Sequence, residues 1–146
     1  MPIEINNTEV IFNGCTFTRS NLLHNNEPLS INYCDFEFSG LQAIQTIPDP
    51  DDLCWIRNTE VSNSTLAGIQ ITSYSKVKIQ NNNIHHNFSG IELYECSGGV
   101  VTDNEISYNG NGILLYHSNA DITGHNNITY NYSSSVHGDN RGGYGI

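Results

Sequence analysis

The chain has 146 residues, the size of one domain, and its hydrophobic content of 37% is low for a conventional globular core. Fifteen acidic residues against five basic ones give a formal net charge of −10, which repels phosphate backbones and argues against nucleic-acid binding. No apolar run approaches the roughly 20 residues that a membrane helix requires, so no membrane insertion is expected.

The predicted elements are short apolar segments that recur along the chain between clusters of Asn, Gly and Ser. In each repeat, one apolar residue stands five positions before another. In chain order the pairs are Phe12/Phe17, Ile31/Phe36, Ile56/Val61, Ile79/Ile84, Val101/Ile106 and, with a threonine in first place, Thr123/Ile128. The steps between the second members of successive pairs are uneven at first and settle to about 22 residues in the later coils. Six coils are therefore predicted, with altered turns in the first coils, including the Pro- and Asp-rich loop at 48–52.

The later coils repeat with a constant period. The segments 68–71, 90–93 and 112–115 all begin with Gly-Ile, and their apolar residues alternate as they do in short strands. A unit of about 22 residues holds three such strands and three turns, and the 3.6-residue period of helical repeats is absent. We therefore predict an all-β fold, a single-stranded parallel β-helix of about six coils that comprises residues 1–146 as one domain.

One turn position carries Asn82, Asn104 and Asn126, which are again one repeat apart. Stacked asparagines about one strand spacing apart hydrogen-bond to each other, so these three predict a structural ladder. Cys15 and Cys34 occupy the equivalent position in the first two coils. Adjacent rungs would place their Cα atoms roughly 5 Å apart, a separation that suits either a disulfide in an oxidising compartment or two buried thiols.

The pattern Asn-x-Ile-x-x-Asn-x-x-Gly-Ile-x-Leu occurs at 82–93 and again at 104–115. It resembles the parallel β-helix repeats of the pectin-lyase-like superfamily, and the resemblance covers most of the chain. The resemblance implies right-handed coils and relatives among carbohydrate-binding proteins, sugar hydrolases, polysaccharide lyases, epimerases and microbial surface proteins. Because the pattern consists of core and turn residues, it specifies the fold strongly and the function poorly.

In lyases and epimerases of that superfamily, the substrate lies along the outer face of one sheet. The resemblance therefore points to outward positions beside the Gly-Ile strands, where a possible carbohydrate face comprises Glu92, Tyr94, Glu95, Tyr116 and His117. Tyrosines beside a glutamate could stack on a sugar, but on a strand they also form cross-strand packing pairs. The carboxylate and base constellations of lyases and hydrolases are not recognisable, so no catalytic residue is predicted.

No metal site and no cofactor are predicted. The four cysteines lack CxxC spacing, and the charge is interpreted as favouring solubility rather than cation binding. His85 and His86 are adjacent, and neighbouring residues of a strand point to opposite faces, so turn positions are favoured over shared chelation. His86, Tyr108 and Tyr130 share one repeat position, which predicts an aromatic stack at a strand end.

Residues 3–5 and 145–146 resemble the same point of the repeat, and neither end carries a convincing cap. Uncapped coils present unpaired backbone groups to other strand edges. The sequence therefore predicts a non-enzymatic extracellular structural module that self-associates through its ends or edges in a cell-surface layer, sheath or fibre. The alternatives are a carbohydrate-active enzyme fragment and a carbohydrate-binding module for acidic polysaccharide.

Overall fold

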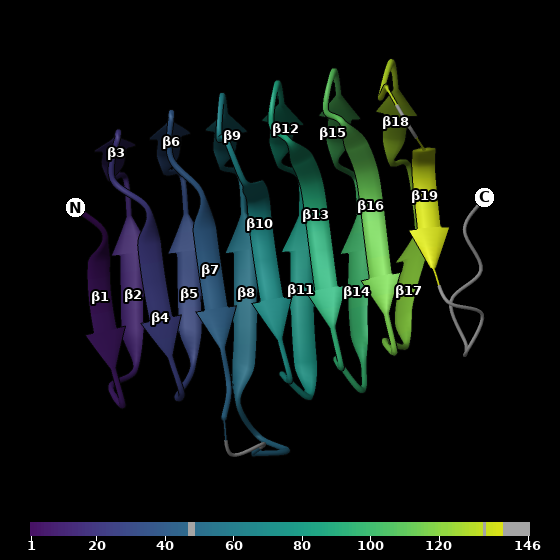
Figure 1. The fold of residues 1–146 in the computed structure, drawn as a ribbon. Coiled ribbons are helices and arrows are strands. Elements are labelled where there is room, and N and C mark those ends of the chain that lie inside the picture. The colour runs from purple at the N-terminus through teal and green to yellow at the C-terminus, as the bar shows by residue number, and fades with distance from the viewer. Residues whose placement is uncertain (47–48, 133, 139–146) are drawn as a thin grey trace.

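The computed structural model describes residues 1–46, 49–132 and, as a backbone strand, 134–138. These residues form nineteen strands and no helix (Figure 1). Accordingly, the described part of the chain contains no helix long and apolar enough to cross a bilayer. Pro48 and residues 145–146, on which two sequence expectations rest, lie outside the described residues.

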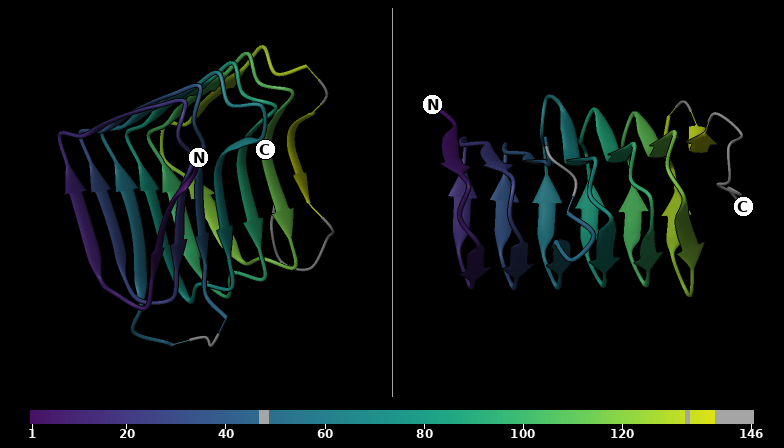
Figure 2. Two further views of the ribbon diagram at one scale, coloured as in Figure 1. Left: turned by 60° about the vertical axis from the view of Figure 1, so that its left-hand side comes forward. Right: turned by 90° about the horizontal axis from the view of Figure 1, so that it is seen from below.

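Three parallel sheets run along the axis of the molecule, and each coil contributes one strand to each sheet (Figures 1 and 2). Sheet A contains β1 (Ile3–Asn6), β4 (Leu22–Asn25), β7 (Leu41–Ile44), β10 (Ala67–Thr72), β13 (Ser89–Tyr94), β16 (Asn111–Tyr116) and β19 (Ser134–Gly138). Sheet B contains β2 (Val10–Asn13), β5 (Leu29–Asn32), β8 (Leu53–Arg57), β11 (Lys76–Gln80), β14 (Gly99–Thr102) and β17 (Ala120–Thr123). Sheet C contains β3 (Thr16–Thr18), β6 (Asp35–Glu37), β9 (Glu60–Ser62), β12 (Asn83–His85), β15 (Glu105–Ser107) and β18 (Asn127–Thr129).

The register of sheet C confirms the predicted coil steps. Its inward residues pair rung by rung in the order Phe17, Phe36, Val61, Ile84, Ile106 and Ile128. After each strand the chain passes through the other two sheets before it returns to the first. This route supplies the crossover connection that neighbouring parallel strands require. The result is a β-solenoid of six coils, as predicted.

One predicted pair is wrong. Val101 pairs with Ile122 and not with Thr123, so the sixth apolar pair is Ile122/Ile128. The reason is a longer turn after β17, which contains Gly124 at a φ of 70°. A methyl group on Gly124 would lie 2.1 Å from the Thr102 hydroxyl oxygen, and glycine avoids this close contact at a positive φ.

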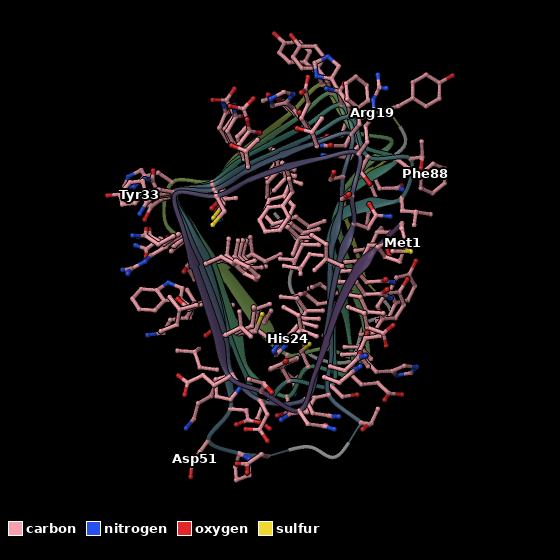
Figure 3. The ribbon with its side chains drawn as sticks, turned by 90° about the vertical axis from the view of Figure 1, so that its left-hand side faces the viewer. Met1, Arg19, His24, Tyr33, Asp51 and Phe88 are labelled. Carbon is pink, nitrogen blue, oxygen red and sulfur yellow. The ribbon has the colours of Figure 1, made fainter. Side chains whose placement is uncertain are left out.

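The core is a column of side chains stacked between the three sheets. Viewed along the axis, the side chains superimpose in columns inside the coil, while Arg19 and Tyr33 point outward at the corners (Figure 3). Fully buried residues alternate with outward ones, as in the burial pattern of β11. The stacked rings of Phe17 and Phe36, 4.4 Å apart, begin one such column. A narrow column needs few apolar residues per coil, which explains the low hydrophobic content.

The predicted asparagine ladder is confirmed in the turn between sheets B and C. The side-chain amide nitrogen of Asn82 donates to Asn104 Oδ1 at 3.0 Å, and that of Asn104 donates to Asn126 Oδ1 at 3.0 Å. Cys15 and Cys34 lie on adjacent rungs at the equivalent position, and the structure holds both as thiols. Their bridging stays a prediction for an oxidising compartment.

Candidate functional site

The outer face of sheet A carries the residues predicted as a carbohydrate face. Two rows of outward side chains run across its strands in register. The first row contains Gln42, Gln70, Glu92 and Leu114, and the second contains Ile44, Thr72, Tyr94 and Tyr116. Glu95 and His117 follow the second row in the next turn, where both adopt left-handed backbone conformations with φ of 54° and 49°. The structure thus brings all five predicted residues together on one face.

A chain of hydrogen bonds connects the first row. The amide nitrogen of Gln42 donates to Gln70 Oε1 at 2.7 Å, and that of Gln70 donates to Glu92 Oε2 at 3.3 Å. The Tyr94 hydroxyl donates to the same Glu92 oxygen at 3.1 Å. Glu92 is therefore held in place by its neighbours on two rungs.

Tyr94 and Tyr116 form a parallel stack, with ring centroids 4.6 Å apart and an interplanar angle of 4°. This packing pair was one of the two interpretations of the tyrosines. On its other side, however, Tyr94 has Thr72 as its rung neighbour, and a threonine is far shorter than a tyrosine. A shallow depression lies at this step, lined by Gln70, Thr72, Tyr94, Glu95, Tyr116 and His117.

Burial and the charge of Glu92 together raise the pKa of Tyr94 to about 12, with burial as the larger cause. The hydroxyl therefore stays protonated at neutral pH and donates to the carboxylate rather than acting as a base. None of the lysines and arginines in the described part of the chain belongs to a strand of sheet A. The face thus offers hydrogen-bonding groups and an aromatic ring.

One expectation about the histidines is wrong. His85 and His86 do not point to opposite faces, because His86 leaves the strand at a φ of 57° and its Nδ1 lies 2.9 Å from His85 Nδ1. His85 Nε2 also lies 3.0 Å from a carboxylate oxygen of Glu60. Over residues 1–46 and 49–132, no group of three or more His, Cys, Asp or Glu side chains could hold a metal ion.

The predicted aromatic stack at the end of the sheet C strands is confirmed. The rings of His86 and Tyr108 stack with centroids 5.2 Å apart, and those of Tyr108 and Tyr130 with centroids 5.1 Å apart.

Gln42 belongs to the sheet A face but was not predicted from the sequence. It lies 28 positions before Gln70, because the loop after β7 lengthens that coil, so the regular period of the later coils could not reveal it.

Comparison with known proteins gave one match. A family model described as a right-handed β-helix region matches residues 3–146. No curated protein and no solved structure matches the chain significantly. The matched model agrees with the three parallel sheets, and it is consistent with the resemblance to the pectin-lyase-like superfamily.

Proposed function

The chain belongs to the right-handed β-helix family, and from this premise we propose that it is a carbohydrate-binding module whose site is the outer face of sheet A. The observation that carries the proposal is the step between Thr72 and Tyr94. There, one face of an aromatic ring has no second ring over it and borders a depression. A pyranose ring lying above Thr72 would stack its C–H groups against that face of Tyr94.

The polar groups around the step suit sugar hydroxyls. The carboxylates of Glu92 and Glu95 accept hydrogen bonds, and Gln70 supplies both an acceptor and a donor. Glu92 is already oriented by Gln70 and Tyr94, so little side-chain freedom would be lost on binding. A polysaccharide is the expected class of ligand for such a site, because the face continues along the solenoid axis from rung to rung.

Binding without turnover is better supported than catalysis. Glycosidases generally cleave the bond with a pair of carboxyl groups that flank it. On this face Glu92 shares its oxygen with two neighbours, and Tyr94 is a protonated donor. We further propose an extracellular or cell-surface location, where polysaccharides are exposed.

Two variants test the site, one by removing the stacking ring and the other by covering its open face. Tyr94→Ala removes the stacking surface, and we expect it to weaken polysaccharide binding about tenfold, which corresponds to about 1.4 kcal/mol. Thr72→Tyr keeps Tyr94 but extends the stack over its open face, so it should abolish binding. Tyr132→Ala is the control, since this tyrosine is 95% exposed and lies outside sheet A.

The measurement is isothermal titration calorimetry with a panel of neutral and acidic oligosaccharides, with circular dichroism to verify that each variant is folded. If no oligosaccharide binds, or if Thr72→Tyr binds as well as the parent, the proposal is wrong. If the parent cleaves a polysaccharide and Glu92→Gln does not, the chain is an enzyme instead of a binding module.

A further inference from the structure

The positive charge of this acidic chain is concentrated on the outer face of sheet B. Of the four basic residues in the described part of the chain, Arg57, Lys76 and Lys78 lie on the neighbouring strands β8 and β11. Two of them, Arg57 and Lys78, lie over the ring of Trp55, the only tryptophan in the sequence. This face is distinct from the proposed sugar-binding face of sheet A.

Two of these cationic side chains lie over the indole ring of Trp55. Lys78 pairs with Trp55 in register, and its Nζ lies 5.5 Å from the centroid of the indole ring. Arg57 lies two residues beyond Trp55 on β8, and its guanidinium carbon is 3.8 Å from that centroid. At these distances both groups are attracted to the electron-rich ring, which fixes them beside each other.

Neither Arg57 nor Lys78 forms an ion pair among the described residues. Lys76 differs, because its Nζ lies 3.0 Å from a carboxylate oxygen of Asp51. The nitrogens Arg57 Nε and Trp55 Nε1 are shielded from solvent and have no hydrogen-bond acceptor within the described part of the chain. Two neighbouring positive charges repel each other, and shielded donors without acceptors raise the free energy of the folded state. An oxyanion bound beside the guanidinium of Arg57 and the ammonium group of Lys78 would offset their repulsion.

We propose that Trp55, Arg57 and Lys78 form a second binding site, which takes an oxyanion carried by a sugar, either the carboxylate of a uronic acid or a sulfate ester. A guanidinium that lies against a ring can still donate hydrogen bonds from its in-plane N–H groups, and these match the two oxygens of such an anion.

The surface beside the cations favours a sugar as the carrier of the oxyanion. A depression borders Lys78 on the side of β14, and its lining includes Leu53, Gly99, Val100 and Asp121. Val100 follows Lys78 in register and is 36% exposed, and Asp121 follows Val100 on the next rung. A sugar ring could place its apolar face on Val100, hydrogen-bond a hydroxyl group to Asp121 and direct its anionic group toward Lys78 and Arg57.

The single tryptophan provides the assay. Fluorescence of Trp55 is titrated with oligogalacturonate, with a sulfated oligosaccharide and with a neutral oligosaccharide of the same length. We expect a saturable change with at least one acidic ligand and none with the neutral one, and the arm that responds identifies the anionic group. Because binding relies on charge, the affinity should fall as the salt concentration is raised from low salt to about 0.5 M, since the Debye length shortens with ionic strength.

Two substitutions locate the ligand. Arg57→Gln should weaken binding about tenfold or more, because it removes a charged donor pair. Lys78→Gln, at an exposed position that does not support the core, should also weaken binding. Arg19→Gln is the matched control, since Arg19 lies 5.5 Å from the ring centroid of Phe38 at another corner of the coil, and it should leave the affinity unchanged.

The proposal is overturned if neither acidic sugar changes the fluorescence, if the neutral sugar changes it equally, or if Arg19→Gln weakens binding as much as Arg57→Gln. A tighter response to single-stranded DNA or to anionic lipid vesicles than to either sugar would also overturn it. Thr72→Tyr, which tests the face of sheet A, should leave this signal intact, so the two sites can fail or succeed separately.

Discussion

Asn104 shows how single residues hold the turn between sheets B and C. Its side chain is 1% exposed, and its amide nitrogen donates to the carbonyl oxygens of Ile79 and Thr102 and to Asn126 Oδ1. Its own Oδ1 accepts from the backbone and side-chain nitrogens of Asn82. One asparagine therefore satisfies buried groups on three consecutive rungs, which is why the position recurs in the sequence.

Asn104→Ala should lower the free energy of unfolding by roughly 2–4 kcal/mol, because it leaves several buried donors and acceptors without partners. The measurement is urea denaturation followed by circular dichroism. Asn83→Ala is the control, since Asn83 is exposed on the outer face of sheet C, and it should change stability by less than about 0.5 kcal/mol. Equal losses for the two variants would contradict a stabilising role of the buried ladder.

At the scale of the element, the strands of sheet A begin at a point of close backbone approach. A Cβ atom on Gly90 would lie 2.5 Å from the carbonyl oxygen of Gly112, and one on Gly40 would lie 2.6 Å from that of Ala67. These contacts join neighbouring rungs through the backbone, which cannot move aside as a flexible side chain could. Glycine at positions 40 and 90 is thus a packing requirement of the sheet A strands.

Gly90→Ala should consequently destabilise the chain by about 2 kcal/mol or more, through overpacking between β13 and β16. Gly14→Ala serves as the comparison, because a Cβ there meets no atom within 4 Å and costs only the strain of a φ of 66°. Thermal unfolding of both variants distinguishes the two effects. A smaller loss for Gly90→Ala than for Gly14→Ala would show that β13 can shift to accommodate the methyl group.

At the scale of the whole molecule, the solenoid gives each sheet its own surface chemistry. Sheet A presents amides, carboxylates and the stacked tyrosines, and sheet B presents the tryptophan with its cations. On sheet C, Asp35, Glu60 and Glu105 occupy one outward row together with Asn83. The three faces therefore differ in the groups that they present to solvent.

Self-association, predicted from the sequence, stays a prediction at this scale. Solenoids extend their sheets by adding rungs along one axis, so copies of the chain could join by continuing the three sheets. Negative-stain electron microscopy over a range of concentrations, with and without reductant, is the measurement. Ordered fibres or tubes would support a structural role, and their loss on reduction would implicate the cysteines; uniform monomers at every concentration would rule out this role.

The repeat in the sequence was enough to predict the coil number, the register of sheet C, the ladder of Asn82, Asn104 and Asn126, and the aromatic stack that contains Tyr108. All of these follow from a repeat of nearly constant length, because residues one period apart become rung neighbours. The residues of the predicted carbohydrate face were also found in this way, although their role in binding stays a prediction.

Contacts that depend on turn length or on side-chain reach became visible only in the folded chain. The pairing of Ile122 with Val101 depends on an inserted turn residue, and the contact between His85 and His86 depends on a left-handed backbone. The cluster around Trp55 joins the neighbouring strands β8 and β11, and its ring contacts depend on how far the side chains of Arg57 and Lys78 reach. A period predicts which backbones lie side by side, whereas the direction and reach of each side chain are set by local turns and by the neighbours it meets.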